Sequence, residues 1–168
     1  MERQLEIKYV KNIDLGKIGK IISIPEEGSM MPLLESSSFK HYGPLGYLAC
    51  SDAFELGIAT FNKRDFIVQQ LEQHVKTQEL CFAIDGDFVM PVAPSRIIDG
   101  AEYPDEESIV AIHVKTGEGV IFDKGTWHGA PYPYGERKQS SVLVLFKKDT
   151  VTTDITFREL SAKYTLVK

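Results

Sequence analysis

Cysteine is scarce in this sequence, and no apolar run is long enough to span a membrane. The two cysteines, Cys50 and Cys81, each lie in a short apolar segment, which argues against the disulfide framework of a small secreted domain. The opening segment Met1–Lys11 is charged and polar and lacks the apolar stretch of a secretory signal. We therefore expect a cytoplasmic protein with reduced core thiols and no membrane partner, although two cysteines also permit one disulfide.

Clusters of basic residues are also missing. The 19 Lys and Arg residues are outnumbered by 24 Asp and Glu residues, and the net charge of −5 disfavours nucleic acid as a main partner. The sequence has no Gly-x-Ser-x-Gly nucleophile motif, no phosphate-binding loop and no dinucleotide-binding fingerprint. A small molecule is the partner that remains.

What the sequence does contain is a succession of short strand-like runs. Its 168 residues, 43% of them hydrophobic, suit one domain covering residues 1–168. Runs rich in β-branched and aromatic residues alternate with turn signals, which favours an all-β sandwich or barrel with little helix. We expect a short helix only at Phe157–Tyr164 and an exposed loop at Ser95–Glu107. The expected strands are Leu5–Val10, Lys20–Ile24, Leu45–Cys50, Leu56–Phe61, Ile67–His74, Leu80–Ile84, Phe88–Ala93, Ser108–Val114, Gly119–Asp123 and Ser140–Phe146.

Two of these strands are apolar on both faces. Val142–Phe146 and Leu80–Ile84 contain almost no polar residue, whereas a strand with one wet face alternates. Each therefore needs a second layer outside the sheet. A homodimer interface would supply that layer, so we expect a homodimer.

Polar residues interrupt this apolar pattern at a few positions. Glu72 and His74 are two residues apart at the end of a strand and point to the same side. Glu79 opens the next apolar run, and His128 follows a Gly-rich strand much later. Two imidazoles and a carboxylate meeting inside a barrel make a plausible divalent metal site with open positions for a substrate.

The spacing of these residues resembles the two motifs of the cupin family. In the first, Glu72, His74, Glu79 and Gly86 follow the family's offsets, with Glu72 in place of the first histidine. In the second, Gly117, Gly125 and His128 match, with Asp123 in the place of proline and Tyr132 in that of asparagine. The resemblance implies a cupin-type double-stranded β-helix, a jelly-roll barrel, and a divergent metal site.

Over most of its length the chain more closely resembles the ureidoglycolate lyase family of allantoin catabolism. The resemblance departs where Gly129 follows His128 and where Glu79 replaces a glutamine. The features that carry it are Asn12–Ser23, Glu72-Gln73-His74, Thr77-Gln78, Gly117-Glu118-Gly119-Val120, Trp127-His128, Pro131 and Asp154-Ile155.

That family cleaves (S)-ureidoglycolate to glyoxylate and urea, a lyase reaction of purine nitrogen catabolism. The resemblance implies a divalent metal, nickel or manganese, on His74, Glu79 and His128. Glu72 is then a fourth ligand or the general base, and Lys124 pairs with the substrate carboxylate.

Other interpretations stay open. The chain could be a non-enzymatic cupin that binds a small carboxylate or sugar, or another metal-dependent cupin such as an isomerase or a dioxygenase, since two histidines and a carboxylate also suit an oxygenase. Among the remaining aromatic and imidazole side chains, His41 is expected to be exposed, His113 to be a core histidine with a satisfied hydrogen bond or a support to the site, and Trp127 to be a pocket wall or plain core.

Overall fold

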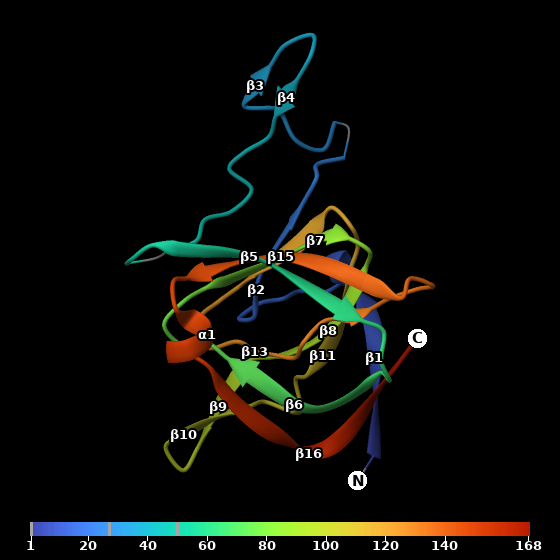
Figure 1. The fold of residues 1–168 in the computed structure, drawn as a ribbon, viewed down its shortest axis with the longest axis vertical. Coiled ribbons are helices and arrows are strands. Elements are labelled where there is room, and N and C mark those ends of the chain that lie inside the picture. Colours follow the sequence, from blue (N-terminus) through green and yellow to red (C-terminus); the bar gives the residue numbers. More distant parts are fainter. Residues whose placement is uncertain (1, 27, 50) are drawn as a thin grey trace.

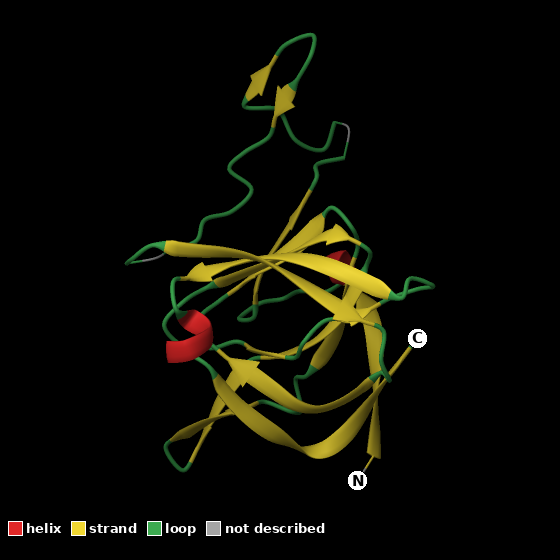
Figure 2. Ribbon diagram, viewed as in Figure 1, coloured by secondary structure: helices red, strands yellow, loops and turns green. Residues whose placement is uncertain are grey.

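The computed structural model describes residues 2–26, 28–49 and 51–168 (Figure 2). Strands dominate it, and its only helices in these ranges are a 3-10 turn, η1 (Val10–Asn12), and one short α-helix, α1 (Thr150–Thr153). The strands are β1 (Glu2–Tyr9), β2 (Gly19–Ser23), β3 (Leu34–Glu35), β4 (Lys40–His41), β5 (Phe54–Asn62), β6 (Ile67–Gln73), β7 (Glu79–Asp85), β8 (Phe88–Ala93), β9 (Ser95–Ile98), β10 (Ala101–Pro104), β11 (Val110–Val114), β12 (Glu118–Phe122), β13 (Trp127–His128), β14 (Tyr132–Pro133), β15 (Gln139–Lys147) and β16 (Thr156–Val167).

Two large sheets form the barrel (Figure 1). The seven-stranded sheet runs β11-β1-β16-β6-β13-β8-β14, and an extra pairing of β11 with β8 closes it into a ring. Within it, β1 pairs in parallel with both β11 and β16. The five-stranded sheet runs β2-β12-β7-β15-β5 and is antiparallel throughout.

Strand β8 explains why the core has two parts. All six of its residues are buried, and side chains alternate across a strand. Met90 and Val92 therefore pack into one cluster with residues of the five-stranded sheet, while Val89 and Ala93 pack into a second cluster with Trp127. Strand β8 is therefore apolar on both faces because a packed layer lies on each side of it.

The expected all-β, cupin-type barrel with little helix is confirmed by this strand pairing. Nine of the ten expected strands are present, most of them with shifted ends. The tenth, Leu45–Cys50, is wrong, because residues 45–49 form no strand; residue 50 lies outside the described part. The 45–49 segment instead lies against β12, where the backbone of Gly46 packs closely on Ile121.

The helix expected at Phe157–Tyr164 is also wrong. The segment belongs to β16, which pairs with β6 and β1. Ala162, Tyr164 and Leu166 are buried with exposed or half-buried residues between them, a period of two that helix propensity alone does not reveal. The segment Ser95–Glu107 is largely exposed as expected, but it folds as the β9–β10 hairpin.

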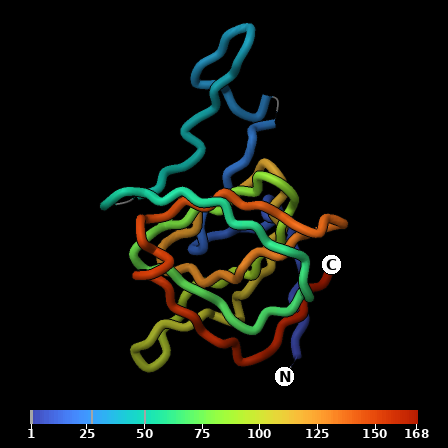
Figure 3. The backbone as a smooth tube through the Cα atoms, in the orientation of Figure 1, coloured from blue at the N-terminus to red at the C-terminus, as the bar shows by residue number. Residues whose placement is uncertain are grey.

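One segment leaves the barrel. The described residues between 24 and 53, which we call the arm, extend away from it and carry the small β3–β4 hairpin at their tip (Figure 3). Cys81 is a free, buried thiol, and Cys50 lies outside the described residues. Neither described helix is long and apolar enough to cross a membrane.

Candidate metal-binding site

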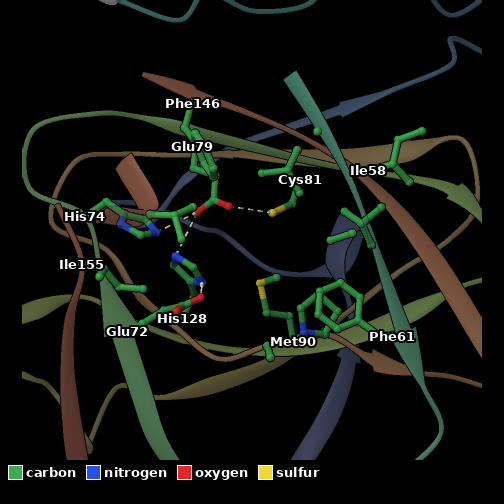
Figure 4. A pocket seen from close by; sticks show the side chains of 17 residues that line it. Ile58, Phe61, Glu72, His74, Glu79, Cys81, Met90, His128, Phe146 and Ile155 are labelled. Atoms are coloured by element: carbon green, nitrogen blue, oxygen red, sulfur yellow. Dashed lines mark hydrogen bonds and ion pairs between the residues drawn. The ribbon is translucent and has the colours of Figure 1, made fainter. Parts of the chain in front are cut away.

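A cavity of about 280 Å³ lies between the two sheets (Figure 4). Its polar side chains are grouped, and most of the remaining wall is aliphatic or aromatic. The lining residues are Gly57, Ile58, Ala59, Phe61, Glu72, His74, Glu79, Cys81, Met90, His128, Ala130, Pro131, Val142, Val144, Phe146, Val151 and Ile155.

The seven-stranded sheet supplies three of the polar residues. Strands β6 and β13 are antiparallel, and His128 stands directly opposite Glu72, so both side chains emerge on one face. His74 follows the last residue of β6, and its carbonyl accepts a hydrogen bond of 2.7 Å from the N–H of Gly125. Gly125 has φ +80°, a conformation that side-chain-bearing residues rarely adopt. This turn brings β13 back beside β6 and places the two imidazoles in contact, with ring centres 5.4 Å apart.

Glu79 comes from the opposite sheet, at the first residue of β7. Its Oε2 lies 3.0 Å from Nε2 of His128 and 3.6 Å from Nε2 of His74. On the other side of the His128 ring, Nδ1 lies 3.6 Å from Oε1 of Glu72. The four side chains thus form a chain of alternating carboxylates and imidazoles, and all but Glu72 are buried.

The orientation of His74 is fixed by a second set of contacts. Its Nδ1 lies 2.5 Å from the carbonyl oxygen of Asp154. A carbonyl can only accept, so Nδ1 carries the proton and Nε2 is the ring nitrogen that faces Glu79; in a neutral ring, Nε2 would present a lone pair there. The carboxylate of Asp154 in turn accepts the N–H groups of Val75 at 3.1 Å and Lys76 at 2.8 Å, which holds the segment in place.

This arrangement fits a bound cation. Glu79 Oε2 and both ring nitrogens of His128 are buried and have no aligned hydrogen-bond partner among the described residues. Buried polar atoms without partners are costly, and here they converge with the lone pair of His74. A positive charge between the carboxylate and the imidazoles would satisfy them, and a ligating histidine bonded through its other nitrogen to a carbonyl is the usual support of a metal site.

The pKa values of this group favour a proton on His128, which would compete with a metal for the same place. Burial favours neutral Glu79, but the neighbouring His128 and His74 outweigh it and hold the pKa of Glu79 below its ordinary value. Burial likewise favours neutral His128, but the charge of Glu79 raises the pKa of His128 above its ordinary value. The pair therefore favours separated charges inside an apolar cavity. Burial raises the pKa of the Cys81 thiol well above normal, so Cys81 is a neutral wall residue and no nucleophile.

The structure brings together four of the five residues predicted for the site. Glu72, His74 and His128 each offer a ligand atom within 4.8 Å of the others, and Glu79 contacts both imidazoles. The predicted ligand set took Glu79 rather than Glu72 as its carboxylate; the geometry makes both available. Lys124 is exposed in the turn before β13 and does not line the cavity.

Other residues considered in the sequence lie elsewhere. His113, which is half-buried, donates a 2.9 Å hydrogen bond from Nε2 to Asp87 outside the cavity lining, so its hydrogen bond is satisfied as expected. His41 is exposed on β4, and Trp127 is fully buried in the second core cluster rather than in the cavity wall.

Two contributions were missed. The sequence analysis names Asp154 only as part of the family resemblance and predicts no contact for it. Nothing in the local pattern around Asp154 connects it to His74, 80 positions earlier. The wall from β5 and β15, including Phe61 and Phe146, could not be assigned because alternation alone does not say which face of a strand meets the cavity.

Comparison with known proteins gives limited information. No family model matches the chain, and no curated protein matches it. Solved structures of oxalate decarboxylase from Bacillus subtilis are similar, one of them from work on its Mn(II) centres: that structure has 18% identity and a TM-score of 0.43 over 66% of this chain and 24% of the other. A second has 16% identity and a TM-score of 0.41 over 76% and 35%. The chain thus spans between a quarter and about a third of the length of these proteins.

Proposed function

We propose that this protein is a metal-assisted carbon–nitrogen lyase of the ureidoglycolate lyase type, which releases urea and glyoxylate from (S)-ureidoglycolate. The observation that carries the proposal is the cluster of Glu72, His74, Glu79 and His128 in an apolar cavity, where Oε2 of Glu79 and both ring nitrogens of His128 are buried without an aligned hydrogen-bond partner among the described residues. The sequence motifs that resemble this family place the same four residues there.

The shape and polarity of the cavity favour a small acid over a sugar. A volume of about 280 Å³ is enough for a molecule of the size of ureidoglycolate. Apart from the cluster and the neutral thiol of Cys81, the lining side chains are apolar, so a polyol would leave most of its hydroxyl groups unpaired. This argues against the sugar isomerase and sugar-binding alternatives.

The chain's own residues have distinct parts in the proposed reaction. His74, His128 and a carboxylate would hold the metal, which when bound would acidify the substrate hydroxyl and fix its carboxylate. Glu72, partly exposed at the cavity wall, would accept the hydroxyl proton. As the C–N bond breaks, its electron pair leaves with the urea nitrogen, the new C=O of glyoxylate forms, and Glu72 returns the proton to that nitrogen. The apolar wall keeps water from the cluster and strengthens these interactions.

The direct test is an assay for glyoxylate and urea. Protein loaded with nickel or manganese should form the two products in equal amounts from (S)-ureidoglycolate. A His128→Ala variant should be inactive, while a His41→Ala variant, changed at an exposed histidine on β4, should keep the activity. A wild-type protein that forms no glyoxylate with either metal would contradict the proposal.

A dioxygenase is the second candidate, because two histidines and one carboxylate beside an apolar wall also suit iron and oxygen chemistry. Iron retained through purification, with oxygen consumed in the presence of a small acid, would favour it. Binding of a small carboxylate without metal and without turnover would favour the non-enzymatic alternative.

A further inference from the structure

The arm carries several large apolar side chains that the described part of the chain leaves exposed. Met31 is 86% exposed and Tyr47 is 77% exposed, and Leu33, Leu34 and Phe39 are also more than half exposed. The β3–β4 hairpin has only two residues in each strand. A two-stranded hairpin of this size is not stable alone in water, so its conformation needs a surface to pack on.

The barrel has an apolar surface that is only partly covered. On the side of the five-stranded sheet away from the cavity, cross-strand pairs form two rows, which together we call the outer face. One row is Leu56, Leu145 and Leu80, and the other is Ile58, Leu143 and Phe82, of which Ile58 on the edge strand also borders the cavity. Leu56 and Ile58 are 65% and 66% exposed, while the four residues of β7 and β15 are half-buried.

The chain covers the far end of this sheet itself. A Cβ at Gly46 would lie 2.5 Å from Cδ1 of Ile121, so the base of the arm lies directly on β12. The N–H of Ala49 also donates a 3.0 Å hydrogen bond to Gln78. Among the described residues, the base of the arm reaches no further across the sheet. Strand β5 remains a long edge strand with apolar side chains, and no strand of the sheet pairs with its outer edge. Such an edge invites association unless it is covered.

The solvent-accessible surface of this chain is larger than that of a compact monomer of the same mass. A compact monomer of this mass exposes about 8,300 Å², whereas this chain exposes 9617 Å². The excess of about 1,300 Å² is more than the roughly 800 Å² that each partner buries in a stable complex.

We propose that the occupant of the outer face is the arm of a second copy of this chain. Each protomer carries both parts, an apolar arm and an apolar face that the arm does not cover, so a two-fold exchange satisfies both at once and closes the assembly. This gives the expected homodimer a specific form. Because β5 also presents Gly57, Ala59 and Phe61 to the cavity, the exchanged arm would brace one wall of the site.

The test uses two double variants of the full-length protein and one control. The arm variant combines Met31→Glu and Leu33→Glu, the face variant combines Leu56→Glu and Ile58→Glu, and the control is Ile97→Glu on the β9 hairpin, a residue 65% exposed. All five side chains are exposed in the isolated chain, so each variant should fold, which circular dichroism and thermal unfolding will verify.

Sedimentation velocity at several concentrations should show a dimer for the wild type and for the control. The arm and face variants should each raise the dimer dissociation constant about a hundredfold or more, because charges would enter a buried apolar contact at two symmetry-related places. An equal mixture of the two variants should associate more strongly than either alone, since one wild-type arm then meets one wild-type face.

Several results would overturn the proposal. They are a monomeric wild type at all concentrations, an arm variant that dimerises like the wild type, a control that dissociates as the variants do, or a mixture no more associated than its components. None of these readouts depends on activity, so failure here leaves the proposed lyase function untouched.

Discussion

The barrel contains two histidine–carboxylate clusters that differ in how well their atoms are satisfied. In one, His113 makes a 2.9 Å hydrogen bond with Asp87, whose other oxygen accepts the N–H of Thr116 at 2.9 Å. In the other, Oε2 of Glu79 and both ring nitrogens of His128 are buried at ion-pair distance but without aligned hydrogen bonds among the described residues. Both join residues distant in sequence, and the second lines the cavity between the sheets.

The difference separates a structural cluster from a functional one. Satisfied polar groups stabilise the fold that contains them, whereas buried groups left without partners cost stability and persist where another requirement keeps them. We propose that this requirement is a cation and a substrate. A histidine beside a carboxylate is therefore informative only when its remaining atoms are accounted for.

The largest expected effect comes from replacing one histidine of each cluster, His128 or His113, by alanine. His128→Ala should lower kcat/KM for ureidoglycolate by about a thousandfold or more, because a metal-holding side chain is lost. His113→Ala should keep the activity but lower the free energy of unfolding by about 1–3 kcal/mol, because Asp87 loses a partner. Steady-state kinetics and urea denaturation measure both, and equal loss of activity in the two variants would end the distinction.

A smaller effect is expected at Glu72, which faces Nδ1 of His128. Glu72→Gln should weaken metal binding by about 10–100-fold if it supports the ring, with a larger loss in kcat if it is also the base. Isothermal titration with manganese separates affinity from turnover. Glu159→Gln, on β16 outside the cavity, is the matched control; unchanged binding and turnover in Glu72→Gln would exclude both roles.

The satisfied cluster should govern stability in acid. Burial works against ionised Asp87, but hydrogen bonds from Thr116 and His113 outweigh it and hold the pKa of Asp87 below its ordinary value. Its folded pKa therefore lies below its unfolded pKa, and the stabilisation is complete above the unfolded value of about 3.9 and lost as the pH falls through the folded one. Asp87→Asn should flatten this part of the stability profile, measured by denaturation between neutral and acid pH. An unchanged profile would exclude Asp87 as its source.

The smallest effect is expected at Lys124. The side chain was predicted from its position in the second motif to pair with the substrate carboxylate, but it is exposed and outside the cavity lining. Lys124→Ala should change kcat/KM by no more than about threefold, because an exposed charge is screened by water. A much larger rise in KM would show that the turn closes over the substrate.

Sequence patterns predicted much of the barrel because strand burial is a local property. The apolar runs of β7 and β15 and the turn glycines at positions 86, 117 and 125 are readable along the chain. The β16 strand was mistaken for a helix because its pairing partners, β1 and β6, lie far away in sequence. The arm was missed because its exposure depends on what fails to cover it, which no local pattern shows.

The same reasoning applies to the candidate site. Motif spacing predicted that His74 and His128 lie together. They do so because β13, which carries His128, pairs with β6, which His74 follows. Spacing could not choose between Glu72 and Glu79, because they come from different sheets and reach the imidazoles from opposite sides. Nor could it exclude Lys124, because being next to a motif in sequence does not fix the direction of a turn side chain.

The measurement that bears most directly on the central claim is the metal content and metal affinity of protein purified without chelator. We expect a divalent transition metal bound at one ion per chain in the wild type and in His113→Ala, with thermal stabilisation when nickel or manganese is added back after chelation. We expect neither in His128→Ala. A wild type that neither retains a metal nor gains stability from one, or a His128→Ala variant that binds as tightly as the wild type, would contradict the account.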